Sequence, residues 1–247
     1  MLSDKLSDKQ DIAQIMAKNS IKTNLIEIRN RIDKATINAG RTPSDVKLVA
    51  VSKKKPAEAV VEAFEAGAVI FGENYIQEAI DKAEKINNPD ISWHFIGHLQ
   101  SNKAKFAVKI FDLIHSVGSL KLAKEIDKQA RKINKVQDIL VQINISMEET
   151  KSGISEGEAE DLVKNISQLE NISVKGLMTM PPHYNEPELV TPYFKALNKI
   201  SKKINALELN NVSMSELSMG MTGDFEPAIA EGSTFVRIGT AIFGSRI

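Results

Sequence analysis

The sequence predicts an α/β protein built as a single (β/α)8 barrel, with an extra helix before the first strand. Eight short apolar runs of strand length recur along the chain, and amphipathic helical patterns separate many of them. Most runs are near-continuous rather than alternating, as is typical of parallel strands that are covered on both faces. Eight strands in 247 residues suit a closed barrel. A doubly wound open sheet is the alternative.

The predicted strands are rich in Val, Ile, Phe, Leu and Met, which favour buried strands. In chain order they are VKLVAVS, VIFGENY, WHFIGHL, FDLIHSV, DILVQINIS, SVKGLMTM, NVSMSELSMG and FVRIGTAIFG.

Helical patterns occupy many of the intervals between these runs. The helix before the first strand is expected to end at Gly40, and Pro56 is expected at the first position of the next. Further helices begin at Ser119 and after a capping box of Ser155 and Glu158. Two helices carry clear apolar stripes, made of Ile21, Leu25, Ile28, Ile32 and Ala35, and of Phe194, Leu197, Ile200 and Ile204.

The chain shows no linker rich in Pro, Gly or Ser that would divide it. We therefore predict an N-terminal extension over residues 1–20, helical or frayed, and one barrel domain over residues 21–247. Lys+Arg and Asp+Glu both number 32, so no net charge draws the protein to nucleic acid or a membrane. Cysteine is absent, which excludes thiol catalysis and disulfides and fits a reducing compartment. With no signal peptide or membrane-spanning run, we expect a cytoplasmic protein.

In this fold the active site lies at the C-terminal ends of the strands. That rule selects Ser52, Lys53, Glu73, Asn74, His98, His115, Ser116, Asn144, Ser146, Met178, Thr179, Ser218, Arg237, Gly239 and Thr240. The segments GMTGD and RIGTAIFG, at the last two strand ends, combine glycines with hydroxyl groups. Glycine lets backbone N–H groups approach a ligand, so these segments favour a phosphate site. Ordinary turns are the alternative.

Three consecutive lysines follow the first predicted strand. Lys53 is expected to face the barrel mouth, where partial desolvation would lower its pKa and allow a Schiff base with an aldehyde. Lys54 and Lys55 are expected to be solvated, and a wholly solvated loop is the alternative. A lysine and a phosphate site across one barrel mouth indicate pyridoxal 5′-phosphate. Arg237 would then face its pyridine nitrogen and disfavour protonation there, although a salt bridge within the barrel is equally compatible with its position.

Seven ordered motifs resemble the pyridoxal phosphate homeostasis proteins (the YggS/PROSC family), from about Val46 to Gly244. They are VAVSKKKP, FGENYIQEA, WHFIGHLQSNK, IHSVGSLKLA, QINISMEETKSGI, GLMTM and LSMGMTGDFEPAIAEGSTFVRIGTAIFG. The resemblance implies a barrel like the N-terminal domain of alanine racemase, known as fold-type III, and a Schiff base on Lys53. It further implies cofactor contacts from Asn74, Met221, Thr222, Arg237, Gly239 and Thr240.

Two positions depart from the family pattern. Thr222 stands where the family usually has serine, and because the hydroxyl is retained we expect phosphate binding to survive. Gly118 and Ser119 stand where the family usually has an Asp-Arg pair, so any function of that pair is not carried over. The first twenty residues lie outside the resemblance.

The resemblance implies a carrier that holds pyridoxal phosphate, limits its free concentration and passes it to apo-enzymes without turnover of its own. A monomer is expected if all apolar helix faces are buried within the barrel. An amino-acid racemase is the alternative, but racemisation needs acid–base groups on both faces of the substrate. Alanine racemase supplies the second group from a C-terminal domain, and here His98 or His115 would have to replace it. A third hypothesis is an aldolase that forms a Schiff base between a lysine and its substrate without a cofactor.

Three further sites carry weaker hypotheses. His94 and His98 lack the glutamate of a helical zinc motif, so we expect packing residues and no metal site. Lys151 is a candidate for the cofactor mouth, and Lys54 or Lys55 for a second, weaker cofactor site.

Overall fold

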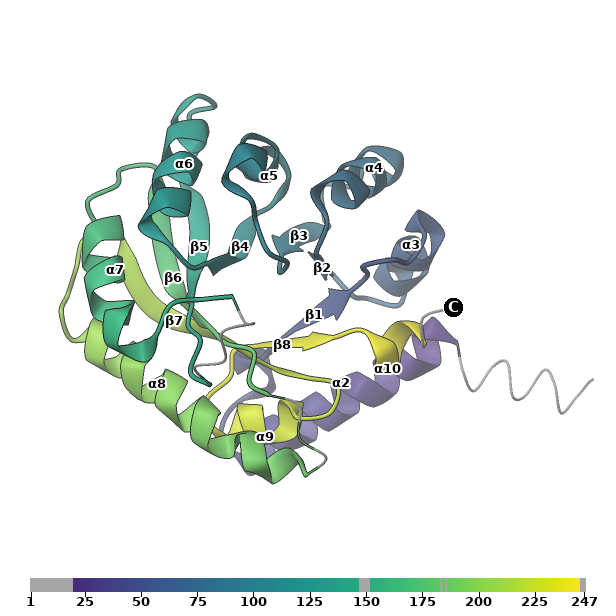
Figure 1. The fold of residues 1–247 in the computed structure, drawn as a ribbon. Helices are drawn as coiled ribbons and strands as arrows, with labels where there is room; N and C mark the ends of the chain where they lie inside the picture. The colour runs from purple at the N-terminus through teal and green to yellow at the C-terminus, as the bar shows by residue number, and fades with distance from the viewer. Residues whose placement is uncertain (1–19, 147–151, 183, 185, 245–247) are drawn as a thin grey trace, which may run out of the picture.

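The protein was analysed as a computed structural model, which describes residues 20–146, 152–182, 184 and 186–244. Eight parallel strands close into a barrel in the order β1 to β8, and the helices surround it (Figure 1). The predicted (β/α)8 barrel is therefore confirmed. The strands are β1 (Lys47–Val51), β2 (Ile70–Glu73), β3 (Ser92–Phe95), β4 (Leu113–Val117), β5 (Gln137–Gln142), β6 (Ile172–Met178), β7 (Val212–Met221) and β8 (Phe235–Ile238).

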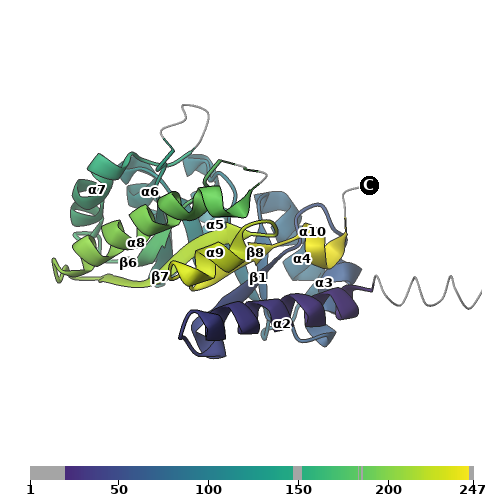
Figure 2. The ribbon, with the colours of Figure 1, turned by 90° about the horizontal axis from the view of Figure 1, so that it is seen from below.

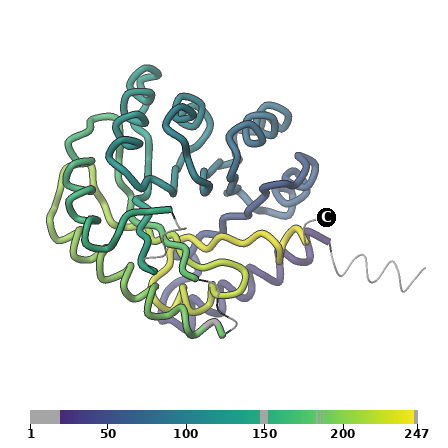
Figure 3. Tube along the Cα trace, in the orientation of Figure 1, coloured from purple at the N-terminus to yellow at the C-terminus, as the bar shows by residue number. Residues whose placement is uncertain are grey.

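The helices follow the strands around the outside of the barrel (Figure 3). They are α2 (Ile21–Asn38), α3 (Ala57–Glu65), α4 (Ile76–Ile86), α5 (Ala104–Ile110), α6 (Leu120–Arg131), α7 (Ala159–Ile166), α8 (Thr191–Asn205), α9 (Phe225–Ala230) and α10 (Thr240–Phe243). Short 3-10 turns occupy Pro43–Asp45, Ser101–Lys103, Glu156–Glu158 and Pro187–Val190. Ser119 caps α6 by accepting from the Leu122 N–H, and the capping box of Ser155 and Glu158 begins the turn before α7, both as predicted.

The extra helix α2 joins the beginning of the described chain to its end. It packs against α9 and α10 (Figure 2). The Asn24 side-chain amide donates to the Ile242 carbonyl at 3.0 Å. The helix therefore covers the side of the barrel where the last strand meets the first.

Alternation along each strand divides the apolar residues between two regions. A large core fills the space between strands and helices, and a smaller cluster lies inside the barrel. The inner cluster consists of Val49, Leu113, Leu140, Met178 and Phe235. Successive side chains of a strand point to opposite faces, so the residue two positions further along the same strand also faces the barrel interior.

The structure corrects the predicted bounds of the last strand and of α3. The last apolar run was read as a strand to Gly244, but β8 ends at Ile238 and α10 follows. Ile242 and Phe243 are adjacent and both buried against the helix layer, an arrangement that a helix provides and an alternating strand does not. Pro56 is the N-cap of α3 rather than its first helical residue.

Residues 1–19 of the predicted extension lie outside the described residues, so the division into an extension and one barrel domain stays a prediction. In the part of the chain that the structure describes, no helix combines the length and apolar character needed to cross a membrane.

Candidate functional site

A cavity of about 280 Å³ opens at the C-terminal ends of β1, β2, β7 and β8. All the cofactor-contact residues predicted from the sequence line it, namely Lys53, Asn74, Met221, Thr222, Arg237, Gly239 and Thr240. The walls also include Lys55, Ile96, Met180 and Phe243, which the sequence analysis did not assign to the site. The barrel topology thus gathers residues separated by almost 190 positions.

Lys53 reaches this cavity because it continues the alternation of β1. Val49 belongs to the inner cluster and Val51 lines the cavity, so the second residue after Val51 falls on the same face. Lys53 is partly buried, whereas Lys54 is exposed, as expected. The expectation that Lys55 is simply solvated was wrong: it is partly buried, lines the cavity and donates from Nζ to the Phe243 carbonyl at 2.8 Å.

Asn74 presents an unsatisfied polar atom at the cavity. Its side-chain Oδ1 is buried and has no hydrogen-bond partner in the described part of the chain. The peptide of Asn74 is held by close packing, because a Cβ at Gly97 would lie 2.3 Å from the Asn74 carbonyl oxygen. A buried acceptor without a donor is costly, so this atom fits a ligand that supplies one.

The opposite wall is a tight turn after β7 and the beginning of α10. The Met221 N–H donates to Asp224 Oδ1 at 2.5 Å, and the Asp224 N–H donates to the Met221 carbonyl at 3.1 Å. These bonds close the turn and leave Thr222 and Gly223 on the cavity wall. Across from them Gly239 and Thr240 form the start of α10. Two hydroxyl groups and two glycines therefore meet at this wall.

Arg237 forms the floor of the cavity. Its guanidinium donates from Nη1 to Ser218 Oγ at 2.5 Å and from Nη2 to the Thr179 carbonyl at 2.9 Å. Burial lowers the pKa of Arg237 to about 10, partly offset by the Asp224 carboxylate. The side chain therefore remains a cation at neutral pH, and its two contacts fix the direction of the planar group.

Below Arg237, two buried histidines continue the polar contacts into the barrel. His115 Nδ1 lies 2.8 Å from Ser218 Oγ, and His115 Nε2 lies 3.0 Å from His94 Nδ1. Arginine only donates, so Ser218 accepts from Arg237 and its own hydrogen finds an acceptor in His115 Nδ1. We therefore assign the proton of His115 to Nε2, from which it donates to His94 Nδ1.

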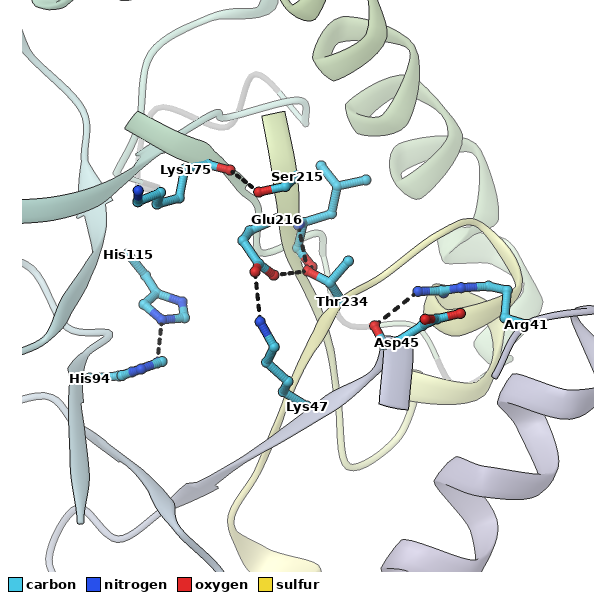
Figure 4. A network of polar contacts seen from close by, with 10 residues as sticks. Arg41, Asp45, Lys47, His94, His115, Lys175, Ser215, Glu216 and Thr234 are labelled. Atoms are coloured by element: carbon cyan, nitrogen blue, oxygen red, sulfur yellow. Dashed lines mark hydrogen bonds and ion pairs between the residues drawn. The ribbon is translucent and has the colours of Figure 1, made fainter. Parts of the chain in front are cut away.

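Both histidines are neutral in the folded protein. Burial lowers the pKa of His94 to about 3, with a smaller effect from Lys47. Burial, His94 and Arg237 lower the pKa of His115 well below its ordinary value. Figure 4 shows the pair near the ion pair that Lys47, at the N-terminal end of β1, forms with Glu216 on β7. His115 was expected at a strand end with a possible acid–base role, but it lies beneath the cavity as a structural hydrogen-bonding residue.

The other strand-end candidates lie elsewhere. His98 and Ser116 line a second cavity of about 600 Å³ beside the beginning of α6, and His98 Nδ1 lies 3.3 Å from Ser152 Oγ. His94 contacts His115 inside the barrel, whereas His98 contacts Ser152, so the two histidines do not form a common site. Asn144 accepts a hydrogen bond from Ser146 at 3.1 Å. Lys151 lies outside the described residues.

Comparison with known proteins agrees with this geometry. Residues 23–247 match the family described as alanine racemase, N-terminal domain. An alanine racemase from Clostridium difficile 630 superposes with a TM-score of 0.69 at 16% identity, covering 88% of this chain and 56% of the racemase. The protein is therefore an α/β barrel of the alanine racemase N-terminal class.

Within that class, the similar relatives are named for pyridoxal phosphate homeostasis. The protein of that name from Aquifex aeolicus is 43% identical, with coverage of 90% of this chain and 96% of the relative. The solved structure of PipY from Synechococcus elongatus with PLP bound has a TM-score of 0.80 and 34% identity, covering 91% of this chain and all of PipY. The chain belongs to the family of pyridoxal phosphate homeostasis proteins.

Proposed function

We propose that the protein binds pyridoxal 5′-phosphate at the barrel mouth, held on Lys53, and acts in pyridoxal phosphate homeostasis as a carrier without substrate turnover. One observation carries this proposal: a lysine, a buried arginine and two glycine-bearing walls surround a single cavity. The names of the relatives and the PLP bound to PipY support the choice of cofactor.

The residues present fit this cofactor. Asn74 Oδ1 is a buried acceptor without a partner, which suits a hydroxyl donor. The wall formed by Thr222, Gly223, Gly239 and Thr240 offers hydroxyl groups and backbone N–H groups suited to a phosphate. Arg237 would face the pyridine nitrogen as a fixed cation and oppose its protonation. Each part of the cofactor therefore has a chemically suitable neighbour.

Lys53 provides the covalent attachment. Bound pyridoxal phosphate would supply an aldehyde, with which the Lys53 amine would be able to form the attachment and release one water molecule. Lys53 is part-buried on the cavity wall.

The geometry favours a carrier over a racemase. A racemase needs proton-transfer groups on two faces of its substrate. Of the described residues that line the cavity, the ionisable ones are Lys53, Lys55 and Arg237. Lys53 and Lys55 follow the same strand, and Arg237 is a cation at neutral pH. His115 is buried in hydrogen bonds, and His98 lines the second cavity.

Transfer of the cofactor to apo-enzymes, a monomeric state and a cytoplasmic location complete the proposal. The cavity opens at the barrel mouth, so a bound cofactor would be accessible to exchange. The monomeric state and the cytoplasmic location follow from the sequence expectations.

The first experiment is an absorbance spectrum of the purified protein with pyridoxal phosphate, before and after borohydride, followed by peptide mapping. We expect an imine band that reduction abolishes and a pyridoxyl adduct on Lys53. Lys53→Ala should lose the band, and Lys54→Asn, which keeps the left-handed backbone at φ 60°, should retain it. Absence of the band in the wild-type protein would contradict the proposal.

Chiral analysis of amino acids after long incubation tests the racemase alternative. We expect no turnover above the level of free pyridoxal phosphate. Turnover that Lys53→Ala abolishes would instead show an enzyme.

A further inference from the structure

Behind Lys53, on the outer side of β1 and β2, lies a buried ionic cluster formed by Lys82, Glu73 and Glu78. Lys82 projects from α4 and is only 5% exposed. Its Nζ donates to Glu73 Oε1, to Glu78 Oε1 and to the Ser52 carbonyl, each at 2.7 Å. An ammonium has three N–H donors, and these contacts match them one to one.

The cluster holds both peptide bonds of Lys53. Lys82 binds the carbonyl of Ser52, which belongs to the peptide before Lys53. Glu78 Oε1 accepts from the Lys54 N–H, which belongs to the peptide after it, at 2.5 Å. Ser52 adds a third connection, since its hydroxyl donates to Glu73 Oε1 at 2.6 Å. The backbone on each side of Lys53 is thus tied to one ammonium group.

This arrangement holds a conformation that the chain would not adopt readily. Lys54 has φ 60°, in the left-handed region that side chains with a Cβ disfavour. Its N–H bond to Glu78 fixes that turn directly after Lys53. Glu73 is fully buried, its Oε2 has no partner among the described residues, and burial raises its pKa. Lys82 is therefore the cation that compensates this carboxyl group.

We propose that Lys82 is a positioning residue for Lys53: together with Glu78 it fixes the two flanking peptides so that the Lys53 amine, and not that of Lys54 or Lys55, meets a ligand in the cavity. The inference rests on the proposed function in that Lys53 is taken as the reacting amine. Glu78 and Lys82 lie four residues apart on α4, a spacing that brings their side chains together on one face of the helix.

The test compares three variants without ligand. Lys82→Met removes the ammonium and keeps the stem. Glu78→Ala removes the acceptor of the Lys54 N–H but leaves the contact between Lys82 and Glu73. Lys85→Met is the matched control, because Lys85 lies on the same helix and pairs with Glu58 on the exposed surface. Amide hydrogen exchange at Lys54 is the first readout.

We expect exchange at Lys54 to accelerate about tenfold in Lys82→Met and Glu78→Ala, as for loss of a charge-assisted hydrogen bond, and to stay unchanged in Lys85→Met. If Lys82→Met does not fold, Glu78→Ala decides the result. Unchanged exchange in the folded variants overturns the inference, whatever pyridoxal phosphate does.

The second readout is the distribution of borohydride-trapped pyridoxal phosphate among Lys53, Lys54 and Lys55, measured over a range of pH. We expect the ratio of Lys53 to its neighbours to fall about tenfold in Lys82→Met and Glu78→Ala, with an altered pH profile, while Lys85→Met keeps the wild-type ratio. A wild-type ratio in both cluster variants overturns the inference while the proposed function stands. No adduct on Lys53 in the wild-type protein overturns the proposed function instead, and the exchange result then tests the cluster alone.

Discussion

Gly97 packs so closely on the peptide of Asn74 that no side chain fits between them. An added Cβ would lie 2.3 Å from the Asn74 carbonyl oxygen and 2.7 Å from its Cα. Both neighbours are backbone atoms, so one of the two segments would have to move. Because Asn74 Oδ1 is the unsatisfied acceptor at the cavity, its position depends on a residue that does not line the cavity itself.

We therefore expect Gly97→Ala to weaken pyridoxal phosphate binding by about tenfold or more, since small displacements of a binding group have large effects. The measurement is the dissociation constant from the absorbance titration. Gly157→Ala is the control, because a Cβ at Gly157 meets nothing within 4 Å. Equal affinities in the two variants would show that Asn74 does not contribute to binding.

Strands β6 and β7 leave no room for a side chain at Gly176, where their pairing is irregular. The register between them shifts between Val174 and Gly176, and Gly176 pairs with Glu216. A Cβ at Gly176 would lie 1.7 Å from the Glu216 carbonyl oxygen. The same stretch of β7 leads to Ser218 and then to the turn at Met221, so the pairing of these two strands sets the floor and one wall of the cavity.

Gly176→Ala should accordingly destabilise the barrel by about 2–3 kcal/mol or more, because backbone must shift to accommodate the methyl group. Chemical denaturation of the ligand-free protein measures the change, with Gly157→Ala again as the unstrained comparison. A variant as stable as the wild-type protein would mean that the two strands separate easily at this point.

At the scale of the whole molecule, the sequence was sufficient for the barrel and for the residues that gather at its mouth. Strand ends converge in this fold, so Lys53 and Arg237 could be placed together from periodicity alone. The packing between elements could not be predicted from periodicity. Lys55 was expected to be solvated because its partner Phe243 is distant in sequence, and the contacts of Lys82 depend on how α4 packs against β1 and β2.

The buried histidines give the whole protein a pH dependence whose sign follows from linkage. The pKa of His94 is lowered to about 3, from the ordinary histidine value of 6.5. Between these values the unfolded chain binds a proton that folded His94 does not, so the free energy of unfolding falls as the pH falls. His115 acts in the same direction. Glu73 opposes them, because burial raises its pKa and its protonated form favours the fold as the pH falls through the raised pKa.

The contribution of His94 can be isolated by comparing slopes rather than absolute stabilities. Acidification from pH 7 to pH 5 should lower the free energy of unfolding of the wild-type protein more than that of His94→Gln, by about 2 kcal/mol. The reason is that the unfolded wild-type chain takes up a proton on His94, and the unfolded variant has no histidine there. Urea denaturation at several pH values gives both slopes. His98→Gln serves as the control, since His98 is exposed at the barrel mouth and contacts Ser152 rather than the buried histidine pair. If His94→Gln and the wild-type protein lose stability equally on acidification, His94 is not kept neutral by burial.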